Sequence, residues 1–170
     1  MELKSGDIIL TSTDSIVARF MRMFQSDPVE YGHALMVRNS NDAYEASLYV
    51  RIIPLEKIFK KRKHYIILRY KGIEQRHISI MNKALDKLVG NLYSFKRFIL
   101  QFFDHVFNTN YFTKLDKDTK SQICSSLVAW AYYVATRIKF NYVSWRSTDP
   151  DDIFDHCLNN SDEWEVIEKV

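Results

Sequence analysis

The N-terminal part of the chain consists of short apolar or alternating runs that are typical of β-strands. Each run is bounded by glycine or polar residues, as strands usually are. The runs are GDIILTST (6–13), HALMV (33–37), AYEASLYV (43–50) and HYIILRY (64–70). The polar segment RNSND separates the second run from the third, which predicts a β-hairpin. Pro54 closes the third strand region, and the segment IPLEKIFKK around it predicts the start of a short helix.

After Gly72 the apolar residues recur at helical spacing. One stripe predicts a helix that stops near Gly90, and a second, aromatic stripe predicts another between Phe95 and Val106. We interpret the aromatic stripe as core packing rather than as a lipid-binding surface. A third helix is predicted at 121–135, which has the sequence SQICSSLVAWAYYVA.

The C-terminal segment predicts one more helix and one more strand. The helix covers DPDDIFDHCL (149–158), with Asp149 as its cap and Pro150 as its first residue. EWEVIEKV predicts a last edge strand. Because the strands come first and most helices later, the order indicates an α+β fold.

The composition fits one folded domain that spans residues 1–170. Apolar residues make up 46% of the chain, enough for a real core, and charges interrupt every apolar run before it reaches the length of a membrane span. The N-terminal MELKSGDIIL has an early acidic residue and no long apolar stretch, so it does not resemble a secretory signal. Two cysteines are too few for a disulfide scaffold, and the simplest expectation is a reduced, cytoplasmic protein.

The charge and the potential metal ligands exclude further classes of partner. A formal net charge of +3 does not indicate nucleic acid. We interpret the basic run KKRKH (60–64) as a solvated loop in preference to a patch for an anionic partner. The cysteines and His156 lack the paired spacing of a zinc site, so we expect neither a metal nor a cofactor.

Cys124 lies where a polar segment gives way to an apolar helix, and two interpretations of it are open. With Ser121 as the helix cap, Cys124 falls in the first turn beside Leu127 and Val128, a position typical of a small core residue. The first turn also has unpaired N–H groups and the positive end of the helix dipole, which lower the pKa of a cysteine. A nucleophile there needs a base, so the histidines decide between the two interpretations.

His33 has the context expected of that base, because a strand would fix it while the preceding loop leaves room for a substrate. The other histidines, which we interpret as surface or packing residues, are His64, His77, His105 and His156. Glu45 could orient the imidazole of His33. The two residues share a face of the sheet if paired residue numbers have an even sum, which requires an odd-numbered turn at RNSND. Otherwise Glu45 is an ordinary carboxylate at the rim.

The order of these segments resembles a known family. GDIIL, then YGHALMV, then YEAS followed by PLEKIF, and finally CSSLVAWAY are similar to a circularly permuted branch of the papain-like cysteine peptidases. The most similar group is the NlpC-like set of YiiX/YaeF-like amidases, which are related to lecithin–retinol acyltransferase. The match runs from Gly6 to about Phe154. It implies a permuted papain-like (NlpC-like) fold: a small antiparallel sheet or partial barrel packed against helices, with the histidine strand before the cysteine helix.

By position, the resemblance implies Cys124 as the nucleophile, His33 as the base and Glu45 as the orienting third residue. Relatives often have an aromatic residue before the cysteine and an acid two positions after it. This chain has Ile123 and Ser126 there, which leaves the three chemical groups intact but puts the substrate preference in question.

Three further residues are candidate substrate contacts. GNLY (90–93) resembles the Gly-x-x-Tyr region of the family, which implies a role for Tyr93. Tyr31 and Ser125, beside the base and the nucleophile, are the other two.

The implied activity is that of a cysteine amidase or peptidase. A thioacyl intermediate would form on the cysteine during cleavage of a small peptide-amide or lipid-amide substrate, or of an ester. An acyltransferase that uses the same intermediate and a non-catalytic binding module of the same fold are the alternatives. A protein that adheres to anionic lipid through KKRKH is a weaker one.

Overall fold

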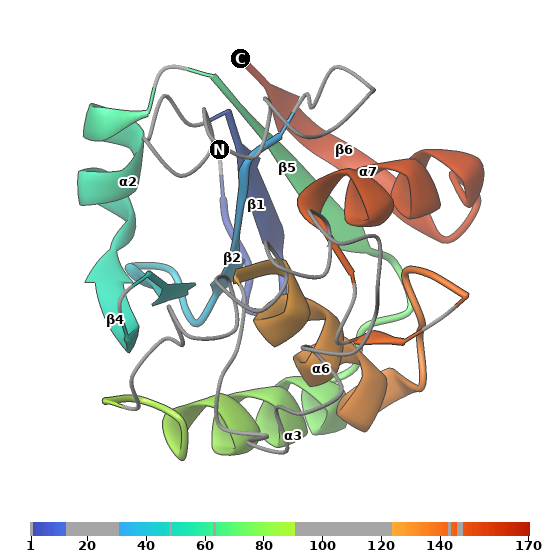
Figure 1. Cartoon of the computed structure of the whole chain (residues 1–170), viewed down its shortest axis with the longest axis horizontal. Coiled ribbons are helices and arrows are strands. Elements are labelled where there is room, and N and C mark those ends of the chain that lie inside the picture. Colours follow the sequence, from blue (N-terminus) through green and yellow to red (C-terminus); the bar gives the residue numbers. More distant parts are fainter. Residues whose placement is uncertain are drawn as a thin grey trace, which may run out of the picture.

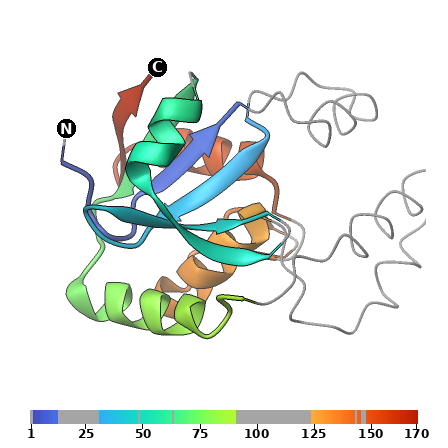
Figure 2. The same ribbon diagram turned by 90° about the vertical axis from the view of Figure 1, so that its left-hand side faces the viewer.

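In this computed structural model, an antiparallel sheet lies at the centre of the part of the chain that the structure describes, with helices on both faces (Figure 1). The described residues are 2–12, 31–47, 49–62, 64–90, 124–142, 144–145 and 148–170. Within them the strands are β1 (Ile8–Thr11), β2 (His33–Val37), β3 (Asp42–Ala46), β4 (Val50–Pro54), β5 (Tyr65–Tyr70) and β6 (Trp164–Lys169). They form one twisted six-stranded sheet in the order β4-β3-β2-β1-β5-β6 (Figure 2). The predicted α+β class is confirmed.

The position of each strand in the sheet explains its sequence pattern. β1 and β2 are central, and every residue of β1 is buried, so continuous apolar runs are required there. β6 lies at an edge, where Trp164 is buried and Glu165 is exposed. The last edge strand predicted for EWEVIEKV is therefore confirmed.

The turn between β2 and β3 sets the register on which the site depends. Leu35 pairs with Glu45, so paired residue numbers have an even sum. The N–H of Arg38 donates to the carbonyl of Asp42 at 2.8 Å, which closes a turn with an odd number of residues, 39–41. The predicted hairpin is therefore confirmed, in the register that puts odd-numbered residues of β2 and β3 on one face.

The segment 43–50 differs from the prediction, which treated it as one strand. It contains the end of β3 and the start of β4, joined by a tight turn in which the N–H of Ser47 donates to the carbonyl of Tyr49 at 3.2 Å. Both strands are rich in strand-forming residues, so the apolar pattern continues across the turn and hides it. The consequence is a direct pair between Glu45 and Arg51.

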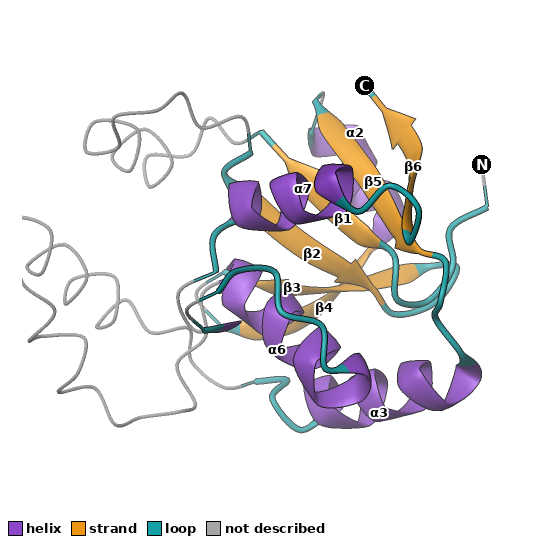
Figure 3. Cartoon of the chain, turned by 90° about the vertical axis from the view of Figure 1, so that its right-hand side faces the viewer, coloured by secondary structure: helices purple, strands orange, loops and turns teal. Residues whose placement is uncertain are grey.

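The described helices are α2 (Leu55–Lys61), α3 (Gln75–Asp86), α6 (Cys124–Thr136) and α7 (Pro150–Asn159). Figure 3 shows α6 and α7 on one side of the sheet and α2 on the other. The predicted cap of α7 is confirmed, because the side chain of Asp149 accepts from the N–H of Asp152 at 2.8 Å and Pro150 is the first residue. α3 ends earlier than the predicted stop at Gly90. The helix predicted at 95–106 lies outside the described residues.

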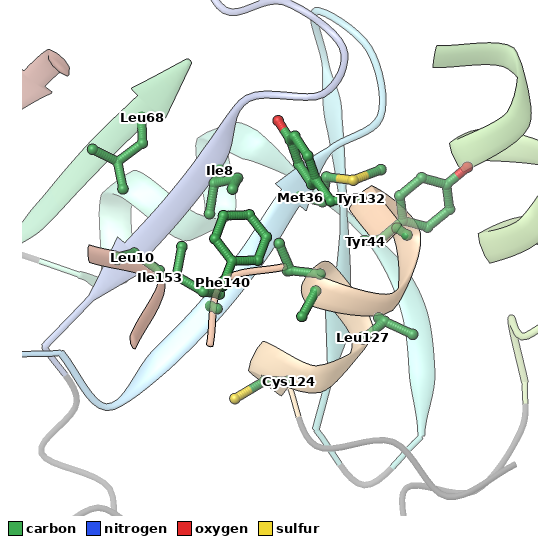
Figure 4. Close-up of a cluster of buried hydrophobic side chains, with 14 of the residues drawn as sticks. Ile8, Leu10, Met36, Tyr44, Leu68, Cys124, Leu127, Tyr132, Phe140 and Ile153 are labelled. Carbon is green, nitrogen blue, oxygen red and sulfur yellow. The ribbon is translucent and has the colours of Figure 1, made fainter. Parts of the chain in front are cut away.

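Two buried clusters hold these layers together. The larger one, which contains Ile8, Met36 and Tyr132, fills the space between the sheet and α3, α6 and α7 (Figure 4). The smaller one, which contains Leu35 and Ile58, lies between the sheet and α2. Among the described residues, no helix is long and apolar enough to cross a membrane.

Candidate active site

His33 and Glu45 form a largely buried pair at one end of the sheet. His33 is the first residue of β2, and the register of the hairpin puts it on the same face as Glu45 of β3. Nε2 of His33 lies 3.1 Å from Oε1 of Glu45, and the two side chains are 12% and 4% exposed. The predicted arrangement of these two residues is present.

Cys124 meets His33 from α6. It is the first residue of α6 that the structure describes, it is 6% exposed, and it lies at the edge of the larger core cluster (Figure 4). Its thiol is hydrogen-bonded to the His33 side chain, and the backbone N–H groups of Ala34 and Ser125 donate to the sulfur. Sequence positions 33 and 124 are thus brought together by the packing of α6 on β2.

The electrostatics of this pair favour its ionised form. Burial opposes ionisation of the Cys124 thiol, but the neighbouring imidazole and the two N–H donors lower its pKa overall. Burial likewise disfavours the charged form of His33, and the thiolate and Glu45 outweigh it, so the pKa of His33 is raised. Each partner therefore stabilises the charge on the other.

The contact with Glu45 fixes how the imidazole is used. An ionised carboxylate only accepts hydrogen bonds, so Nε2 of His33 carries a proton and donates to Glu45. Nδ1 is then the nitrogen that remains for the thiol of Cys124. This tautomer is the one that allows His33 to take a proton from the sulfur.

Two arginines, which the sequence analysis missed, complete the site. Arg51 donates from Nε to Oε2 of Glu45 at 2.8 Å, and its Nη2 lies 2.6 Å from the same oxygen. Arg62 donates from Nη2 to Oε1 of Glu45 at 3.0 Å and from Nη1 to the hydroxyl of Thr11. Burial raises the pKa of Glu45, but His33 and Arg51 more than compensate and lower it to about 2. Glu45 is therefore ionised at any pH near neutrality.

The sequence contained a signal for Arg51 but none for the direction of the Arg62 side chain. Arg51 would have been found by dividing 43–50 into two strands, since it then pairs directly with Glu45. Arg62 belongs to KKRKH, which was interpreted as a solvated loop. That interpretation is wrong for Arg62, because its side chain is only 17% exposed and turns into the site.

The candidate substrate contacts that the structure describes differ in their surroundings. The ring of Tyr31 is buried against Phe154, with 4.9 Å between ring centroids. The hydroxyl of Ser125 is also buried and donates to the carbonyl of Thr148 at 2.7 Å, so this side chain supports the fold, and only its backbone N–H faces the sulfur. Tyr93, like Ile123 and Ser121, lies outside the described residues.

The remaining histidines in the described residues make other contacts. His64 is exposed, Nδ1 of His77 accepts from the backbone N–H of Glu74, and His156 packs against Phe140. His105 lies outside the described residues. The second cysteine, Cys157, is buried, and burial raises its pKa.

The comparisons with known proteins identify the fold. No family model matches the sequence, and no curated protein matches it. The crystal structure of YiiX from Escherichia coli O157:H7 matches with a TM-score of 0.69 at 14% sequence identity, covering 100% of this chain and 99% of that chain. The chain thus has a YiiX-like fold, and the predicted order, with the histidine strand before the cysteine helix, is present.

YiiX is described as a metalloprotein. The corresponding test on this chain is whether its own side chains offer a donor set, and the described residues contain no group of three His, Cys, Asp or Glu arranged to hold a metal ion. Glu45, the carboxylate that the described residues place beside His33, already receives hydrogen bonds on both oxygens, from His33 and from two arginines. These cationic neighbours disfavour a metal ion, so the described site does not fit one.

Proposed function

We propose that the chain is a thiol-dependent hydrolase that cleaves an amide or ester bond through a thioacyl intermediate on Cys124. The observation that carries this proposal is the hydrogen bond between the Cys124 thiol and His33, in surroundings that lower the pKa of the thiol although it is buried. The YiiX-like fold and the pair formed by His33 and Glu45 support it.

The residues divide the reaction between them. His33 takes the proton of Cys124, and the thiolate attacks the carbonyl carbon, forming a C–S bond. The tetrahedral intermediate then expels an amine or alcohol, which takes its proton from the imidazolium. A water molecule, deprotonated by His33, attacks the thioester, so that the free acid leaves and the thiol is restored. Glu45 keeps the imidazole oriented and stabilises its cationic form throughout.

The first test is the pH dependence of iodoacetamide labelling, followed by peptide mass spectrometry. Cys157 is an internal control, because it is also buried but burial alone raises the pKa of its thiol. We expect alkylation of Cys124 to persist well below about pH 8.5, the usual pKa of a thiol, and His33→Ala to move its onset to higher pH. A Cys124 that labels like an ordinary thiol in both proteins would refute the proposal.

A second measurement addresses the intermediate itself. Brief exposure to an activated ester such as 4-nitrophenyl acetate is expected to add one acetyl group to Cys124. Acid quenching before hydrolysis would reveal the added mass on the intact protein. Cys124→Ser and His33→Ala should both abolish this modification, whereas Cys157→Ser should not.

A further inference from the structure

Arg62 occupies a position between three elements of the candidate site. It follows the last residue of α2, and its backbone N–H caps that helix by donating to the carbonyl of Ile58 at 3.0 Å. Its guanidinium reaches back across the end of the sheet, to the hydroxyl of Thr11 on β1 and to Oε1 of Glu45 on β3. Thr11 is fully buried and lies directly opposite His33 in the register of β1 and β2.

We propose that Arg62 is a positioning residue of this site, which holds the carboxylate of Glu45 and the start of the histidine strand in one geometry through its two guanidinium nitrogens. The inference rests on the proposed function. Its basis is a shared atom: Oε1 of Glu45 accepts from Nη2 of Arg62 at 3.0 Å and lies 3.1 Å from Nε2 of His33. Any rotation of the carboxylate that breaks one of these contacts also disturbs the other.

Arg51 shows that Arg62 is more than a counter-ion for Glu45. Arg51 binds the other carboxylate oxygen, Oε2, so it does not share the atom that orients the imidazole. Its side chain is 42% exposed, so solvent screens its charge, whereas the side chain of Arg62 is largely buried. One arginine would suffice to neutralise Glu45, and the buried second one adds a connection to Thr11 that Arg51 does not make.

The burial of Arg62 makes a purely stabilising role a poor explanation. Removing a guanidinium from water is expensive, and a buried ion pair can often be replaced by apolar side chains with no loss of stability. The planar guanidinium, in contrast, offers donors at fixed angles to two acceptors at once. The arrangement suits orientation better than it suits stability.

The charge of Arg62 also acts on the two titrating groups. Among the described residues, the charged groups that act on His33 are Cys124 from α6, Glu45 from β3 and Arg62 from the end of α2. Asp151 of α7 accepts from the backbone N–H of Tyr31, two residues before His33, at 3.0 Å. Arg62 opposes the positive charge of His33 and favours the negative charge of Cys124. Its removal should therefore make both members of the pair hold their protons to higher pH.

The experiment compares Arg62→Gln, Arg62→Lys and Thr11→Val with Arg51→Gln, and it includes Arg76→Gln, an exposed arginine of α3, as a neutral control. The readouts are the pH profile of Cys124 alkylation by iodoacetamide and the kcat and KM for hydrolysis of 4-nitrophenyl acetate. Circular dichroism checks that each variant is folded.

We expect Arg62→Gln to move the alkylation profile to higher pH and to lower kcat on the order of 10- to 100-fold with little change in KM, the range for loss of a positioning contact. Arg62→Lys should leave the profile in place because it keeps the charge, but it should still lower kcat because an ammonium lacks the planar fork. Thr11→Val should lower kcat without moving the profile. Arg51→Gln should have smaller effects on both readouts.

Several outcomes would overturn the inference. Arg62→Gln with the wild-type profile and kcat would show that the residue has no role in the site, and equal effects of Arg51→Gln and Arg62→Gln would reduce the role to general charge. If Arg62→Gln does not fold, Arg62→Lys and Thr11→Val decide, and unchanged kcat in both would refute positioning. A failure of the proposed function can be told apart from a failure of this inference. It would show as ordinary thiol reactivity of Cys124 in the wild-type protein, and it would remove the basis of the inference as well.

Discussion

The ionised carboxylate of Glu45 should make the stability of the protein depend on acid. Its side chain is 4% exposed and contacts His33, Arg51 and Arg62. Protonation of this carboxylate in the folded state therefore weakens buried, charge-assisted hydrogen bonds. In the unfolded chain the same carboxylate is solvated. Substitution by glutamine keeps the shape of the side chain and removes its titration.

The magnitude follows from the shift in pKa. The pKa of Glu45 falls from 4.5 to about 2 on folding. Because the folded pKa is the lower one, the carboxylate contributes stability above pH 4.5, and this contribution is lost as the pH falls through about 2. One pKa unit corresponds to 1.36 kcal/mol, so the contribution is about 3 kcal/mol, a large share of the total stability of a domain.

Urea denaturation at a series of pH values between 6 and 2 measures this contribution. The free energy of unfolding of the wild type should fall by about 3 kcal/mol more over this range than that of Glu45→Gln, so the two curves converge at low pH. Glu165→Gln, which removes an exposed carboxylate of β6 at 4.0 Å from Arg69, should follow the wild type to within about 0.5 kcal/mol. Parallel curves for the wild type and Glu45→Gln would refute the reasoning, because they would show that Glu45 has the same pKa in both states.

Two smaller predictions concern helix ends. Asp149→Ala should destabilise the protein by about 1 kcal/mol because α7 loses its side-chain cap, whereas Asp149→Asn should have little effect on stability. Equal free energies of unfolding of the two variants in a urea titration would contradict this prediction. Arg137 follows α6 with a φ of 67°, a conformation that favours glycine. Arg137→Gly should therefore stabilise the protein by about 0.5 kcal/mol and raise its Tm. A lower Tm would show that the contact of the Arg137 guanidinium with the ring of Tyr133, at 5.5 Å, contributes more to stability than the backbone strain costs.

The sequence predicted those parts of the site that depend on local pattern. The side-chain contact between His33 and Glu45 depends on strand alternation and on the parity of a short turn, which are local properties; the sequence allowed the required parity, and the family resemblance favoured it. The cap of α7 followed from the order of Asp149 and Pro150. In each case the partner lies a few residues away along one element or across one hairpin.

The parts that were missed depend on how distant elements pack. The turn between β3 and β4 was hidden because strand-forming residues continue through it, and this concealed the pairing of Arg51 with Glu45. Arg62 stands in a run of basic residues that looks solvated, and only the direction in which α2 ends turns its side chain toward Thr11. A pattern of residue types along the chain contains no information on that direction.

The two cysteines show why burial alone was a poor guide to Cys124. A small residue in an apolar stripe is usually a core residue, and Cys124 does belong to the larger core cluster. Cys157 belongs to the same cluster, and there burial acts without opposition and raises the pKa of the thiol. At Cys124 the imidazole of His33 and two N–H donors act in the same low-dielectric surroundings, where electrostatic interactions are stronger than in water, and they reverse the direction of the shift. The two interpretations of Cys124 are therefore compatible, and a search for reactive cysteines should ask which base a buried thiol meets rather than how exposed it is.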